Sequence, residues 1–194
     1  MGRGSSKIGG SGGIRGAMPS MNEMIEAAEH YMGPEGFEMN KLARGLSVSD
    51  DPDGDYTVAD LQKWDNDFST LLDQQSLKSA KTVFRGTGFD NLLQQTGLTQ
   101  EQILANPNSL KNRSITEHGY MSTANDYANA KSYAQGVVWK ISLPNGAKAV
   151  RQSDLSPMGD YEYTVQKNCE VRITKALVSN GTLIINAKYV DSHK

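Results

Sequence analysis

Three short segments of the chain carry side chains whose types and spacing could do chemistry. The run VFRGTG places Arg85 before a glycine, HGYMSTA contains Ser122, and MGDYEYTV contains Asp160 and Glu162. A guanidinium is planar, permanently charged and suited to binding phosphate oxygens. A carboxylate can stabilise positive charge that develops in a transition state. Residues two apart on an extended backbone point to the same side, so Asp160 and Glu162 could face one pocket together.

Each segment taken alone also has an ordinary structural explanation. An arginine at a strand end is more often a surface ion-pairing residue, and Ser-Thr after an aromatic residue is commonly a strand end. An acidic pair on a strand is usually a solvated face. Their order along the chain favours a shared functional site over three separate structural roles, because Arg85, Ser122 and Glu162 follow one another at intervals of 37 and 40 residues.

In order, spacing and flanking residues, these segments resemble the Arg-Ser-Glu class of mono-ADP-ribosyltransferases. These toxin-like enzymes, of bacterial or phage type, cleave NAD+ and transfer ADP-ribose to a target macromolecule. The resemblance covers roughly residues 38–190, including LLDQQSLKSAKTVFRG before the arginine and YEYTVQKNCEVRIT around the glutamate. It implies an α+β fold, with N-terminal helices packed on a β-sandwich core of two small sheets and an NAD+ cleft between the sheets.

The resemblance also implies a role for each motif residue. Glu162 would stabilise the oxocarbenium-like transition state through the ribose 2′-hydroxyl, and Ser122 would hydrogen-bond Glu162 and fix its orientation. Arg85 would bind the phosphates of NAD+, Gly86 would contact the nicotinamide amide, and Thr123 would support the site through hydrogen bonds.

The acceptor is expected from the residue two positions before the catalytic glutamate. The family has glutamate there with arginine acceptors and glutamine with other acceptors, whereas this chain has Asp160. Aspartate keeps the charge that could orient a guanidinium but is one methylene shorter, so a protein arginine is the favoured acceptor. Tyr161 could belong to a substrate-contacting turn or could simply pack. Ala124 replaces the last serine of the family's Ser-Thr-Ser motif, which removes one hydroxyl.

Two other functions stay open from the sequence. The same site could use water as acceptor, which would make the protein an NAD glycohydrolase. Alternatively, the fold could serve as a non-catalytic interaction module of a phage or secreted assembly. For the transferase we expect a monomer that acts on a target protein, or on a nucleic acid, in the cytoplasm of a host or target cell. A carrier or an immunity partner is also left open.

No metal site is expected. Residues 49–60 nearly fit a calcium-binding loop, but Ser49 would be the first ligand and Asp60 would replace the bidentate glutamate. The chain has three scattered histidines and a single cysteine, Cys169, with no base partner apparent in the sequence.

The elements that position these motifs are predicted to be helices in the first part of the chain and strands in the rest. Apolar residues at helical spacing predict helices over 21–32, 38–46 and 58–79, with Ser20 and Thr57 as caps. Shorter helices are predicted over 99–105 and 125–134, and strands over 82–84, 120–123, 137–143, 147–150, 161–165, 170–176 and 182–189. This order predicts a helical lobe (residues 21–80) followed by a mainly β catalytic core (81–190) within one domain, residues 21–194.

Composition limits what else the chain can be. Its 194 residues carry a net charge of -2, and 37% are hydrophobic, below the about 45–50% of ordinary globular proteins. Residues 1–20 form a glycine-rich basic segment that predicts a flexible tail, and its first 16 residues hold 7 of the 19 glycines. No apolar secretion signal is visible in it. The remainder is acidic, which gives no strong attraction to nucleic acid.

Overall fold

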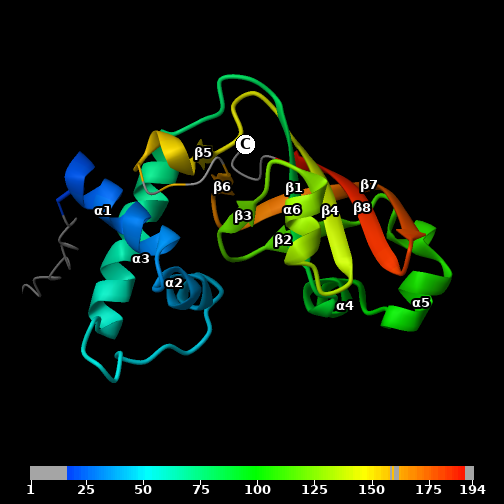
Figure 1. Ribbon diagram of the computed structural model, residues 1–194, viewed down its shortest axis with the longest axis horizontal. Coiled ribbons are helices and arrows are strands. Elements are labelled where there is room, and N and C mark those ends of the chain that lie inside the picture. Colours follow the sequence, from blue (N-terminus) through cyan, green and yellow to red (C-terminus); the bar gives the residue numbers. More distant parts are fainter. Residues whose placement is uncertain (1–16, 158, 160–161, 191–194) are drawn as a thin grey trace, which may run out of the picture.

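Helices occupy the first part of the chain and strands most of the rest (Figure 1). The computed structural model describes residues 17–157, 159 and 162–190. The three helices of the helical lobe are α1 (Met21–Met32), α2 (Gly36–Ala43) and α3 (Val58–Gln74). The expected basic tail lies mostly outside the described residues. None of the helices among the described residues is both long enough and apolar enough to cross a membrane.

Two capping boxes fix where the long helices begin. Ser20 Oγ accepts a hydrogen bond from the backbone N–H of Glu23, whose carboxylate accepts one from the Ser20 N–H. Thr57 and Asp60 make the same reciprocal pair before α3. These pairs satisfy N–H groups that a helix start otherwise leaves without partners, so the predicted starts at residues 21 and 58 are confirmed. The predicted end of the third helix at residue 79 was wrong, because α3 ends at Gln74.

A five-stranded mixed sheet forms the larger part of the core. Its order is β1 (Lys81–Thr87), β4 (Val137–Leu143), β8 (Thr182–Val190), β7 (Cys169–Ser179) and β2 (Ser114–Glu117). The β4–β8 pair is parallel and the others are antiparallel. Asn180 and Gly181 join β7 to β8 with φ values of 48° and 74°, which suits a tight hairpin turn.

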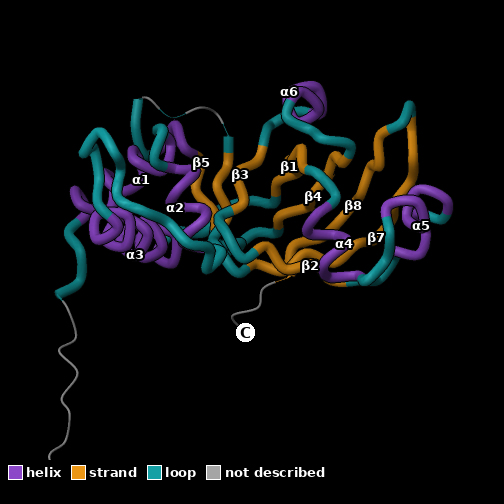
Figure 2. The backbone as a smooth tube through the Cα atoms, turned by 90° about the horizontal axis from the view of Figure 1, so that it is seen from below, coloured by secondary structure: helices purple, strands orange, loops and turns teal. Residues whose placement is uncertain are grey.

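A three-stranded antiparallel sheet lies beside it, in the order β3 (Met121–Thr123), β6 (Tyr163–Val165) and β5 (Ala149–Arg151). Phe84 of β1 and Ala124, just after β3, exchange two backbone hydrogen bonds and so join the two sheets. Figure 2 shows β3 and β5 between the helical lobe and the strands of the larger sheet. Side-chain alternation fits this position, because Ala149 packs in the core of the larger sheet and Val150 in the core of the helical lobe.

Shorter elements cover the larger sheet or link its strands. They are α4 (Asp90–Thr96), α5 (Gln100–Ala105), η1 (Pro107–Leu110) and α6 (Tyr127–Ser132), whereas η2 (Gln152–Asp154) follows β5 in the smaller sheet. The predicted α+β class, with N-terminal helices and two sheets, is confirmed. The two sheets are unequal, since the larger one has five strands of mixed direction and curls around its core. Strand β2 and helix α4 were not predicted.

Candidate active site

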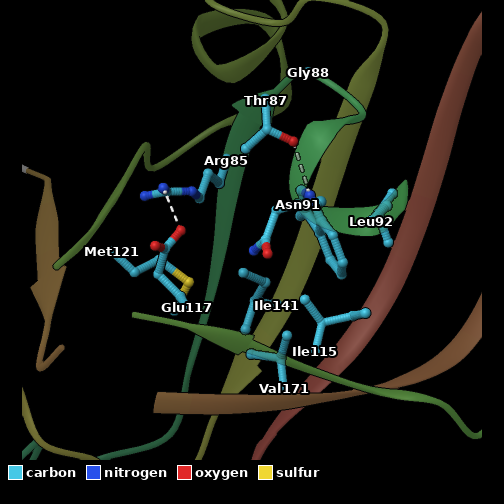
Figure 3. A pocket seen from close by; sticks show the side chains of 11 residues that line it. Arg85, Thr87, Gly88, Asn91, Leu92, Ile115, Glu117, Met121, Ile141 and Val171 are labelled. Carbon is cyan, nitrogen blue, oxygen red and sulfur yellow. Dashed lines mark hydrogen bonds and ion pairs between the residues drawn. The ribbon is translucent and has the colours of Figure 1, made fainter. Parts of the chain in front are cut away.

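Arg85 is held at the junction of the two sheets. It lies in β1, and its side chain is 15% exposed. One terminal guanidinium nitrogen donates to the backbone carbonyl of Ser122 at 2.9 Å. The other donates to Glu117 Oε2 at 2.8 Å, as Figure 3 shows. Two fixed hydrogen bonds orient the guanidinium, and the structure therefore brings Arg85 and Ser122 into direct contact.

Glu117 links Arg85 to the helical lobe. Its second oxygen, Oε1, accepts from Arg44 Nε at 3.2 Å and from the backbone N–H of Gly119 at 3.1 Å. Glu117 is 14% exposed, so a largely buried carboxylate lies between two guanidinium groups. Neither Arg44 nor Glu117 was predicted from the sequence. Glu117 directly precedes the HGYMSTA segment, and this position was the one sequence feature that pointed to it. Arg44 lies 73 positions away from Glu117, so nothing comparable in the sequence pointed to Arg44.

A small cavity of about 50 Å³ adjoins this cluster. Arg85 and Glu117 lie at one end of it, and the rest of its wall is mostly apolar, with Ile141 and Val171 among the lining residues (Figure 3). Pockets that bury drug-sized ligands usually measure about 300–1,000 Å³. This cavity is therefore too small for a dinucleotide.

Ser122 contacts the helical lobe through its hydroxyl group. Ser122 Oγ lies 2.7 Å from the hydroxyl oxygen of Tyr31 in α1, and Asn40 Nδ2 donates to the same Tyr31 oxygen at 3.0 Å. Either hydroxyl of the Tyr31–Ser122 pair can donate to the other, so Asn40, Tyr31 and Ser122 form one hydrogen-bonded group. Burial raises the pKa of the Tyr31 phenol, which keeps its hydroxyl group protonated.

Thr123 holds the smaller sheet together. It is 3% exposed, and its hydroxyl donates to the backbone carbonyl of Tyr163 at 2.8 Å. Thr123 also pairs with Tyr163 in the β3–β6 ladder. This contact strengthens the pairing of the strand that carries Ser122 with the strand that follows Glu162.

Glu162 lies immediately before β6 and is half-buried. Its backbone carbonyl accepts from the N–H of Gln152 at 2.9 Å, which extends the β5–β6 ladder by one residue. Ser122 pairs with Thr164, and Glu162 is two residues before Thr164. Alternate residues on an extended strand share a face, so Ser122 and Glu162 lie on the same side of the smaller sheet.

Gly86 lies beneath helix α6. A Cβ atom at this position would lie 2.1 Å from the carbonyl oxygen of Ala130 and 2.7 Å from the backbone nitrogen of Ala134. Backbone atoms this close could not remain in place, so the absent side chain lets α6 and the turn after it lie directly on β1. From the sequence, Gly86 was expected only to contact the ligand, and this packing role was not predicted.

The remaining sequence candidates divide between undescribed and structural positions. Asp160 and Tyr161 lie outside the described residues. Cys169 is 2% exposed, and burial raises the pKa of its thiol to about 12, so it is protonated near neutral pH. His118 Nδ1 lies 3.4 Å from Asn168 Oδ1 beside a turn. Within the described ranges, the histidine, cysteine and acidic side chains form no group of three or more that could hold a metal ion.

The sequence matches a known family over most of its length. A model of the ADP-ribosyltransferase exoenzyme family matches residues 19–191. No curated protein matches the chain in sequence.

Solved structures of bacterial toxins share the fold. The ADP-ribosylating toxin BECa of a C. perfringens binary enterotoxin, with NADH, has a TM-score of 0.67 at 16% identity, over 90% of this chain and 44% of that one. This chain therefore spans less than half of BECa. C3stau2 from S. aureus, with NAD, has a TM-score of 0.66 at 20% identity, over 92% and 91% of the two chains. An ADP-ribosyltransferase from Clostridium botulinum has a TM-score of 0.66 at 19% identity, over 87% of each chain.

Proposed function

Since the chain belongs to the ADP-ribosyltransferase exoenzyme family, we propose that it cleaves NAD+ at the nicotinamide–ribose bond and transfers ADP-ribose to an arginine of a target protein. One observation carries this proposal. Arg85 donates to the carbonyl of Ser122, and the strand register gives Ser122 and Glu162 a common face. This arrangement supports a common site for the three motif segments.

The chemistry needs few catalytic groups. NAD+ supplies a bond between ribose C1′ and a positively charged nicotinamide nitrogen, and breaking it leaves the electron pair on that nitrogen and neutralises the leaving group. No general acid is required, unlike ordinary glycoside hydrolysis, where a carboxylic acid protonates the leaving oxygen. Glu162 would stabilise the positive charge that develops on the ribose. The acceptor nitrogen then forms a bond to C1′ and loses one proton.

The charge of the arginine cluster supports binding of a diphosphate. Arg44 and Arg85 share the single carboxylate of Glu117, which leaves one surplus positive charge. Arg44 is 34% exposed and can be reached from solvent. Guanidinium groups held in fixed orientations bind phosphate oxygens at a smaller entropic cost than mobile side chains do. We assign Arg85 to the phosphates of NAD+, with Arg44 beside it.

Ser122 would position Glu162 in this scheme. Asn40 and Tyr31 hold the Ser122 hydroxyl in place on the face of the smaller sheet that it shares with Glu162. Thr123 maintains the strand pairing, and Gly86 the close approach of α6. Asp160, two residues before Glu162, supplies the acidic group that favours an arginine acceptor.

One experiment tests activity and acceptor together. The purified chain is incubated with labelled NAD+ and a cell lysate, free nicotinamide is measured, and labelled species are identified by mass spectrometry. Nicotinamide release with ADP-ribose on protein arginines is the expected result. Release of free ADP-ribose with no labelled macromolecule would instead identify an NAD glycohydrolase, and label on a nucleic acid or on another residue type would contradict the proposed acceptor. No NAD+ consumption would contradict the proposed function altogether.

A further inference from the structure

Helix α6 reaches the site through a side chain that none of the three motifs contains. Asn129 lies in α6, and its amide Nδ2 donates a hydrogen bond to Glu162 Oε1 at 3.2 Å. The two residues are 33 positions apart, on different elements. The carboxylate proposed to act on the ribose therefore has a donor that fixes one of its two oxygens.

The position of Asn129 follows from how α6 is held. Asp126 caps the helix, because its side chain accepts from the backbone N–H of Asn129 at 2.8 Å. The next residue, Ala130, is 1% exposed and packs with Ala124 and Val138. Small side chains on this face, together with the glycine beneath it in β1, bring the helix backbone close to that strand. Asn129 itself is exposed and lies on the site side of this close contact.

We propose that Asn129 is a positioning residue for Glu162, an inference that rests on the proposed function. An amide N–H stabilises an ionised carboxylate and restricts its rotation. Ser122 of β3 lies on the same face of the smaller sheet as Glu162, and Asn129 contacts Glu162 from α6. This arrangement holds the carboxylate ready for the ribose, and Asn129 contributes to turnover without itself contacting the reacting atoms.

The substitution Asn129→Asp tests this with little change in shape. It removes the donor and places a second carboxylate against Glu162, while aspartate in the first turn of a helix is favourable for the helix itself. Asn129→Ala removes the donor without adding charge. Asn66→Asp is the matched control, since Asn66 is an exposed helical asparagine in α3, outside the site.

The variants are compared by NAD+ consumption in steady state and by thermal unfolding. We expect Asn129→Asp to lower kcat about tenfold or more, the scale of a hydrogen bond to a charged group, with KM for NAD+ within about twofold. The kcat of Asn129→Ala should lie between those of wild type and Asn129→Asp. Melting temperatures should stay close to that of wild type, and Asn66→Asp should match wild type in every measurement.

Three outcomes would overturn the inference. Asn129→Asp could keep its kcat, it could be no slower than Asn129→Ala, or its loss could lie in KM alone. Any of these, with wild-type enzyme that consumes NAD+, would refute the role of Asn129 and leave the proposed function standing. Wild-type protein that consumes no NAD+ would instead refute the proposed function and this inference with it.

Discussion

The hydroxyl of Tyr31 lies 2.7 Å from Ser122 Oγ, across 91 positions of sequence. Tyr31 belongs to the helical lobe and Ser122 to the smaller sheet, so the lobe takes part in ordering the candidate site. Tyr31 also stacks on Phe68 and meets the ring of Tyr120 edge-on, which fixes where its hydroxyl points.

Replacing Tyr31 with phenylalanine should separate the effect of its hydroxyl from that of its ring. Tyr31→Phe keeps the ring contacts but leaves Ser122 Oγ and Asn40 Nδ2 without this partner, at a cost of about 1 kcal/mol in the free energy of unfolding. NAD+ cleavage should also slow, because Ser122 loses its orientation. Denaturant unfolding and initial rates measure both effects. Tyr56→Phe, at a half-buried tyrosine of the lobe, is the control, and equal behaviour of the two variants would contradict the role given to Tyr31.

Neutralising Glu117 should destabilise the fold. Glu117→Gln removes the negative charge between Arg44 and Arg85 and leaves two guanidinium groups near one another. We expect this to lower the free energy of unfolding by about 2 kcal/mol, which is less than the cost of breaking a fully buried ion pair. Glu26→Gln changes an exposed glutamate of α1 and should cost almost nothing. Denaturant titration of both variants decides this, and the prediction fails if they unfold at the same denaturant concentration.

Substitution by alanine should affect stability very differently at Gly86 and at Gly88. Gly86→Ala forces a methyl group against backbone atoms of Ala130 and Ala134 and should destabilise by about 2 kcal/mol as α6 moves. At Gly88 a Cβ would meet only Gln135 side-chain atoms, at 3.5 Å and beyond, so Gly88→Ala should be nearly neutral. Thermal melting of the pair tests the claim. Similar melting temperatures would show that α6 does not depend on Gly86.

Stability should decline in alkaline solution. Burial raises the pKa of the Cys169 thiol from 9.0 to about 12, and burial likewise raises the pKa of the Tyr31 and Tyr120 phenols above 10.0. Between about pH 9 and pH 12 the folded state therefore binds more protons than the unfolded state. The contribution of these protonated groups to the free energy of unfolding is complete below about pH 9 and is lost as the pH rises toward 12. Unfolding free energies at pH 8 and pH 10.5 should show the decrease. A value that stays constant or rises would contradict it.

Local patterns in the sequence predicted those features that depend on nearby residues. The caps at Ser20 and Thr57 each involve a partner three positions away, and both were found where expected. Helix α4 was missed because it has no side-chain cap at its start, whereas the shorter α5 and α6 begin after the capping residues Thr99 and Asp126. Strand β2 was missed because its four residues include a single buried apolar side chain, Ile115.

The site residues also divide into those that local sequence patterns indicated and those that only contacts in the folded chain reveal. Arg85, Ser122 and Glu162 stood out through their motifs. Glu117 and Asn129 did not, because their importance comes from contacts with Arg85 and Glu162 that only the folded chain brings together. The tyrosine of α1 that meets Ser122 similarly appeared in the sequence only as part of a helix, whereas its link to Ser122 depends on how the lobe packs on β3.

Glu162 carries the central step of the proposed reaction, and nicotinamide release from NAD+ by wild type and by Glu162→Gln tests that step most directly. The substitution keeps the size of the side chain and its ability to accept from Asn129, but removes the charge that would stabilise the ribose cation. We predict a loss of about 10²–10³-fold or more in the rate of release, with an unchanged melting temperature. Release by Glu162→Gln at the wild-type rate would contradict the central claim.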